Sequence, residues 1–90
     1  FLMAEAMTAA GMTAGLPSAL AKQLAEATVT GAGALIEAAS EPPSTLRKNV
    51  TSKGGTTAAA LAVLMADNGL PLLMERAVQA AKKRSVELGA

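Results

Sequence analysis

The sequence contains no cysteine and no histidine, and these two absences exclude several kinds of site. Without cysteine the chain can form neither a disulfide bond nor a thiolate metal site. Without histidine it lacks the most common metal ligand and the usual general base of enzymes. We therefore expect no metal site in this chain.

Aromatic side chains are nearly absent as well, because Phe1 is the single aromatic residue among 90. Hydrophobic residues nevertheless make up 51% of the sequence, which excludes a disordered chain. Alanine is the commonest residue and there are 8 glycines, so helices can approach closely while each buries little area. A domain of this size buries only about 60–65% of its unfolded surface. We expect a partner, most simply a second copy of the chain, to supply the missing core.

Charge and hydropathy exclude two further classes of partner. The net charge is +1, and the chain has neither the basic face nor the stacking aromatics that nucleic-acid binding requires. The longest run without charge, between Glu5 and Lys22, contains Gly11, Gly15 and Pro17 and is not a membrane span. No basic and then apolar segment opens the chain, as a secretion signal would. We expect a cytoplasmic protein without nucleic-acid or membrane partners.

One short turn carries the strongest functional signal, namely the Gly54-Gly55 pair followed by Thr56 and Thr57. Glycine has no Cβ, so the backbone can turn freely and come close to a ligand. The first N–H groups of the helix that follows have no intrahelical partner and lie at the positive end of the helix dipole. Together with the hydroxyls of both threonines and of Ser52, they form a donor-rich cradle for a small anion such as a carboxylate.

The same turn also fits a simpler role as a helix cap. Serine and threonine are favoured N-cap residues, and Gly-Gly pairs are common in loops. The turn is not a phosphate-binding P-loop, because the spacing G-x-x-x-x-G-K-[ST] is absent. The residues alone therefore leave both anion binding and capping open.

Hydrophobic spacing predicts an all-α domain of five helices, with no sheet because no stretch alternates with period two. The first helix is expected over Phe1–Ala10, with Gly11 as its stop. The second is expected over about Pro17–Ala39 and is apolar most of the way round, which predicts burial. Gly31 and Gly33 in its middle indicate close contact with another helix.

Proline and glycine divide the second half of the chain. The residues Ser40–Pro43 break the long helix, and Ser44–Thr51 can form a short one. A fourth helix is expected over Thr56–Asp67, ended by Asn68-Gly69. The last helix should run from Pro71 to about Leu88.

The motifs follow one another in a characteristic order: Gly15-Leu16-Pro17, Gly31-Ala32, Pro43, Leu46-Arg47, Val50-Thr51-Ser52, Gly54-Gly55-Thr56-Thr57, Leu64, Gly69, Ala77-Val78, Arg84-Ser85 and Glu87-Leu88. In this order the sequence closely resembles the C-terminal dimerisation domain of pyrroline-5-carboxylate reductase. The likeness covers nearly the whole chain, residues 1–90, and the glycine-threonine turn is its most specific motif. The first residue is Phe rather than Met, which agrees with a segment of a longer protein.

The resemblance implies both an architecture and a reaction. Five helices would interlock with a second copy to form a helical homodimer, and such dimers can assemble further. The enzymes of this family reduce pyrroline-5-carboxylate to L-proline with NADPH or NADH, the last step of proline biosynthesis. An N-terminal Rossmann domain, outside this chain, would hold most of the nucleotide. This chain alone is therefore expected to be inactive.

The resemblance also assigns the site. Ser52, Gly54, Gly55, Thr56 and Thr57 would form the substrate-binding turn, in which the serine and the amides of residues 55–57 hold the substrate carboxylate. The Thr57 hydroxyl would lie beside the ring nitrogen, where it orients the imine or helps to deliver a proton. Thr57 is thus the expected catalytic residue.

Lys53 departs from the family, which usually has proline at this position. Proline fixes φ and stiffens a turn, whereas lysine does not. Lys53 either adds a cation to the anion site or lies in solvent, and the rigidity of the turn is the property that this residue puts in question.

Two other functions remain as alternatives to an enzyme domain. The chain could be a non-catalytic helical homodimerisation module whose Gly-Gly turn is only a cap, or a stand-alone binder of small anions. The first alternative predicts no binding of proline or of carboxylate-bearing ring analogues, even with the nucleotide domain attached.

Overall fold

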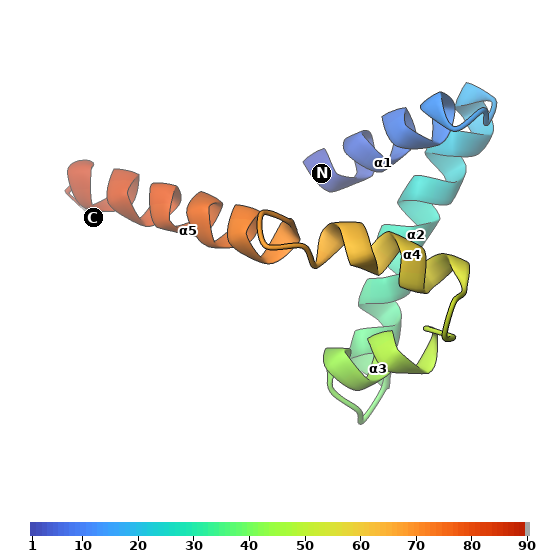
Figure 1. The fold of residues 1–90 in the computed structure, drawn as a ribbon. Coiled ribbons are helices and arrows are strands. Elements are labelled where there is room, and N and C mark those ends of the chain that lie inside the picture. The colour runs from blue at the N-terminus through green and yellow to red at the C-terminus, as the bar shows by residue number, and fades with distance from the viewer. Residues whose placement is uncertain (90) are drawn as a thin grey trace. The chain divides into compact units, whose positions relative to one another are not determined.

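The structure is a computed structural model that describes residues 1–89. These residues form five helices and no strand, which confirms the all-α prediction (Figure 1). The helices are α1 (Leu2–Thr13), α2 (Ser18–Ala38), α3 (Pro43–Asn49), α4 (Thr56–Leu64) and α5 (Leu70–Glu87). The chain divides into two compact units, the first covering Phe1–Thr45 and the second beginning at Leu46.

The end of α1 lies three residues beyond the predicted one, so the proposed stop at Gly11 is wrong. The helix ends at Thr13, and the chain leaves it through Gly15, whose φ of 108° is open to glycine but strained for other residues. The N–H of Gly15 donates to the carbonyl of Met12 at 3.0 Å, and that of Leu16 donates to the carbonyl of Gly11, also at 3.0 Å. These two bonds form a Schellman motif, which satisfies the last carbonyls of the helix.

Gly11 has a different role, because it lies where α1 meets α2. A Cβ on Gly11 would be 3.3 Å from the Cβ of Ala21 and 3.4 Å from Cδ1 of Leu16. Ala21 and Ala25 are 2% and 5% exposed, and they are the only buried residues among the described ones. The first unit is therefore a helical hairpin whose core is made of small side chains in close contact.

The helix α2 matches its predicted length to within one residue at each end, with Pro17 as the N-cap rather than the first helical residue. Its predicted burial does not occur within one chain, because Leu24 and Ile36 are 48% and 52% exposed. A Cβ on Gly31 or Gly33 would meet no atom within 4 Å. The helix contact that these glycines predict is therefore not supplied by the described residues.

The second unit differs from expectation at the end of α4. This helix stops at Leu64 rather than at Asp67, and Asn68-Gly69 is not its stop. Gly69 is instead the N-cap of α5, whose first turn contains Pro71 and which ends one residue before the predicted Leu88. No residue of α5 is buried. Its exposed hydrophobic side chains include Leu72, Leu73, Met74, Val78 and Val86.

Candidate functional site

The turn before α4 is closed by a hydrogen bond between Gly55 and Ser52. The N–H of Gly55 donates to the carbonyl of Ser52 at 3.0 Å, which makes Lys53 and Gly54 the two central residues of a four-residue turn. Gly54 has a φ of 73°, whereas Lys53 has a negative φ, as does every described residue other than glycine. A positive φ at the second central residue is the signature of a type II turn. The chain therefore needs glycine at position 54 for its backbone conformation.

Gly55 is needed for space rather than for its φ. Its backbone is extended, with φ −87° and ψ −177°, which other residues also adopt. A Cβ at this position would, however, lie 2.8 Å from Oγ of Ser52 and 3.2 Å from its carbonyl oxygen. The Ser52 hydroxyl thus lies directly against the residue that begins α4.

The start of α4 leaves backbone donors free. The first bond into the helix runs from the N–H of Ala59 to the carbonyl of Gly55 at 3.1 Å, and no side chain caps the helix. Within the described residues, no acceptor is present for the N–H groups of Thr56, Thr57 and Ala58. These three donors lie at the positive end of the α4 dipole.

The hydroxyls predicted to cap this helix do not do so. Ser52, Thr56 and Thr57 make no side-chain hydrogen bond to any described residue, whereas Thr51 in the same turn donates to the carbonyl of Arg47. The capping role considered from the sequence is therefore not found here. The start of α5 also lacks a side-chain cap, so free amides alone do not distinguish α4. The start of α4 differs from that of α5 in the hydroxyls of Ser52, Thr56 and Thr57 around it.

The five predicted site residues lie in this one turn and in the first turn of α4, with one change in their use. The Gly55 amide already donates to Ser52, so the free amides are those of residues 56, 57 and 58. Sequence reasoning did not assign Ala58. The general rule that a helix leaves its first amides unpaired contains the signal, because the N–H of this third helical residue is one of them. Thr57 is half-buried, and Ser52 and Thr56 are exposed.

Lys53 is exposed and forms no ion pair with a described residue. It occupies the first central position of the type II turn, where proline is favoured because the required φ is close to that of the proline ring.

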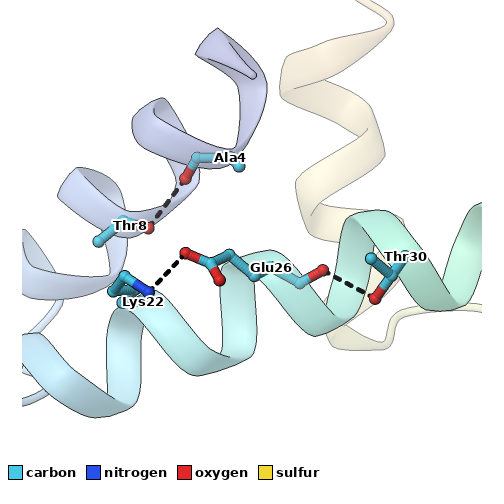
Figure 2. A network of polar contacts seen from close by, with 5 residues as sticks. All are labelled: Ala4, Thr8, Lys22, Glu26 and Thr30. Atoms are coloured by element: carbon cyan, nitrogen blue, oxygen red, sulfur yellow. Dashed lines mark hydrogen bonds and ion pairs between the residues drawn. The ribbon is translucent and has the colours of Figure 1, made fainter.

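A separate groove lies between α1 and α2, and none of its lining residues belongs to the turn. It is lined by Phe1, Ala4, Glu5, Thr8, Ala9, Met12, Lys22 and Glu26. Figure 2 shows its polar groups: Lys22 pairs with Glu26 at 2.9 Å, and Oγ1 of Thr8 donates to the Ala4 carbonyl at 2.9 Å. Each bond links residues four apart on one helix; the ion pair is exposed and the Thr8 bond is part-buried, and both are ordinary helix contacts, so this groove carries no reactive arrangement.

Residues 1–89 offer neither a metal site nor a membrane span. No group of three acidic side chains there could hold a metal ion. No helix in that range is both long and apolar enough to cross a membrane.

The fold and the turn together define a class of protein, a helical domain whose core within one chain is small and whose α4 begins with free amide donors. The chain belongs to the family described as "Pyrroline-5-carboxylate reductase dimerisation", which matches residues 1–88. This family implies a homodimer, and it confirms the resemblance drawn from the sequence motifs.

Similar proteins agree with this family. The pyrroline-5-carboxylate reductase of Synechocystis sp. is 47% identical over 88 residues, covering 98% of this chain and 33% of that protein. The enzyme of Arabidopsis thaliana is 44% identical over 88 residues, covering 98% of this chain and 32% of its own length. A crystal structure of Plasmodium falciparum pyrroline carboxylate reductase with NADP bound has a TM-score of 0.91 and 30% identity, covering 99% of this chain and 34% of that one. The chain thus spans about a third of the length of these relatives.

Proposed function

We propose that this chain is the dimerisation and substrate-binding part of an enzyme that reduces pyrroline-5-carboxylate to L-proline with NADPH or NADH. The family match over residues 1–88 supports the reaction, and the relative that binds NADP supports the kind of cofactor. The cytoplasm is the proposed location. Further assembly of dimers is compatible with this role.

One observation supports the position of the substrate. Three amides at the start of α4 have no acceptor among the described residues, and the Ser52 hydroxyl lies beside Gly55, the N-cap of the same helix. A carboxylate there would accept charge-assisted hydrogen bonds, each worth about 1.5–3 kcal/mol. The helix dipole adds about 0.3–1 kcal/mol for an anion. The turn Ser52–Gly55, with Gly54 setting its path, would present these donors to the substrate carboxylate.

Thr57 is the proposed catalytic residue. Reduction of an imine adds a hydride to carbon and a proton to nitrogen, so the ring nitrogen must face a group that can orient or relay a proton. The Thr57 hydroxyl makes no hydrogen bond within the described residues and is therefore free for this role. Its N–H would at the same time contribute to carboxylate binding.

The nucleotide is assigned mainly to a part of the protein outside this chain. The motif G-x-G-x-x-G is absent, because Gly31 and Gly33 are followed by Ile36 instead of a third glycine. The described residues therefore do not fit the phosphate-binding role, and the chain by itself is expected to lack reductase activity.

The test is Thr57→Val in the full-length protein. Loss of the hydroxyl should lower kcat about 10-fold to 100-fold with a smaller change in KM, because the side chain acts on the reacting nitrogen. The dimer should persist in sedimentation. Thr13→Val, an exposed change at the end of α1, is the matched control. Unchanged kcat in the Thr57 variant would remove this residue from the mechanism.

Binding separates the enzyme domain from a module that only pairs helices. Calorimetry with proline on the intact protein should show saturable binding that weakens when Ser52 is changed to alanine. Absence of binding, in a protein that still dimerises, would favour the non-catalytic module.

A further inference from the structure

The joint between α4 and α5 is the short segment Met65–Gly69 (Figure 1), and Gly69 has little space around its Cα. A Cβ on Gly69 would collide with the carbonyl oxygen of Leu64, and it would lie 3.0 Å from that of Ala66. The N–H of Gly69 donates to the Ala66 carbonyl at 2.8 Å. The glycine is therefore held by its amide, and it has no room for a side chain on its Cα.

Asn68 precedes this glycine and is exposed. An Asn-Gly pair can react with itself: the glycine nitrogen attacks Cγ of the asparagine side chain, ammonia leaves, and a five-membered succinimide forms. Water then opens the ring to aspartate or to isoaspartate. The reaction needs water and no oxidant or reductant, and asparagine is among the thermally labile residues for such reasons. The bare Cα of glycine leaves the attacking nitrogen unhindered.

In the closed joint that nitrogen is not free to attack. Its N–H donates to the Ala66 carbonyl, so the peptide cannot rotate towards the Asn68 side chain without breaking this hydrogen bond, and the space beside its Cα is closed by the Leu64 carbonyl even to a methyl group. Attack therefore requires local opening. We propose that Asn68 is a site of spontaneous deamidation whose rate is set by opening of the joint between α4 and α5.

The product determines what happens next. Isoaspartate lengthens the backbone by one methylene directly before Gly69. With this longer backbone, Gly69 cannot return to its native position beside Leu64. Each opening then carries a risk of irreversible damage, which makes the joint a limit on the lifetime of the folded protein. Aspartate at position 68 keeps the backbone unchanged and should leave the joint intact.

The chain contains its own control. Asn49, the only other asparagine, is followed by Val50. The branched side chain of valine shields the attacking nitrogen, so Asn49 should remain unmodified even in an unfolded chain.

The experiment compares native and denatured full-length protein at mildly alkaline pH, with peptide mapping that resolves aspartate from isoaspartate. Asn68 should be modified in denaturant and at least about tenfold more slowly in native buffer, which corresponds to a joint open less than about a tenth of the time. Asn49 should be unmodified in both, and Asn68→Gln should abolish the reaction. Equal deamidation rates at Asn68 in the two conditions would show that opening of the joint does not control the rate. No modification of Asn68 in denaturant would show that it is not a deamidation site.

A second measurement tests the consequence for the joint. Chains carrying isoaspartate at position 68 should fail to return to the dimer after dilution from denaturant, whereas Asn68→Asp chains should return as the unmodified protein does. Equal recovery of the two would contradict the idea that the joint cannot accept a longer backbone.

Discussion

The starts of α4 and α5 share one backbone geometry and differ in chemistry. Each helix begins after an extended glycine, Gly55 or Gly69, each lacks a side-chain cap, and neither glycine has room for a Cβ. Gly55, however, faces the hydroxyl of Ser52, whereas Gly69 faces the backbone carbonyl of Leu64. A helix start is therefore not a site by itself, and the side chains around it decide what it does.

The residues that follow each glycine also make the first turns of α4 and α5 differ in polarity. The first turn of α4 begins with Thr56 and Thr57, which keep their amides and add two hydroxyls. The first turn of α5 begins with Leu70 and Pro71, so it is apolar and one of its amides is lost to the proline ring. The α4 start thus has the free donors and hydroxyls that the proposed anion site requires, whereas the α5 start is apolar.

Gly69→Ala should give the largest effect on stability. The new methyl meets only backbone atoms, those of Leu64 and Ala66, including the Leu64 carbonyl carbon at 2.8 Å, so the joint itself must shift. We expect a loss of about 2–3 kcal/mol in the free energy of unfolding. Urea unfolding at fixed dimer concentration measures it. A loss as small as that of an exposed alanine change would show that the joint yields easily.

Gly55→Ala should separate binding from stability. Here the atom nearest the new methyl is a side-chain oxygen, Ser52 Oγ at 2.8 Å, which can rotate away, and the Ser52 carbonyl oxygen at 3.2 Å needs only a small shift. Stability should fall by only about 1 kcal/mol, while proline affinity falls at least about tenfold because the hydroxyl leaves its position. Calorimetry and urea unfolding of the same sample give both values. Equal losses in the two would mean that Gly55 serves the fold alone.

Ser52→Ala should weaken proline binding about tenfold, which corresponds to one hydrogen bond to a charged group, and leave stability unchanged. Ser85→Ala, an exposed change in α5, is the matched control. If Gly55→Ala acts by displacing this hydroxyl, the double variant should bind no more weakly than either single one. Additive losses of proline affinity in the double variant would show that Gly55→Ala does not act through the Ser52 hydroxyl.

Lys53→Pro should have the smallest effect and the opposite sign. Lys53 has a negative φ, stands at the turn position that favours proline, and its N–H donates no backbone hydrogen bond among the described residues. Proline should therefore raise stability by about 0.4–1 kcal/mol through the unfolded state. Thermal unfolding at fixed concentration checks it. A destabilised variant would show that the turn needs the freedom of lysine.

The sequence identified most elements because their signals are local. Hydrophobic spacing, Pro17, Pro43 and Pro71 marked the helices, and most of their ends lie within two residues of expectation. Two ends were wrong for the same reason. In both cases a glycine was interpreted as a helix stop. Gly11 instead lies inside α1, next to Ala21, and Gly69 is the N-cap of α5, next to the Leu64 carbonyl.

The candidate site was accessible from sequence because its members are neighbours in the chain, from Ser52 to Thr57. The hydrogen bonds of these residues could not be predicted from the sequence. That the Gly55 amide is already engaged, and that Ala58 provides a free one, depends on which carbonyl each N–H reaches.

By itself, then, the sequence determined the helical class, the family, the residues of the turn and the need for a partner, because composition and motif order carry this information locally. Only the tertiary structure decided which glycines serve packing and which serve backbone conformation. The sequence does not distinguish a glycine that makes room for a neighbouring atom from one that is required for its positive φ. The neighbour at the missing Cβ distinguishes them: Ala21 for Gly11, Leu64 for Gly69 and the Ser52 hydroxyl for Gly55.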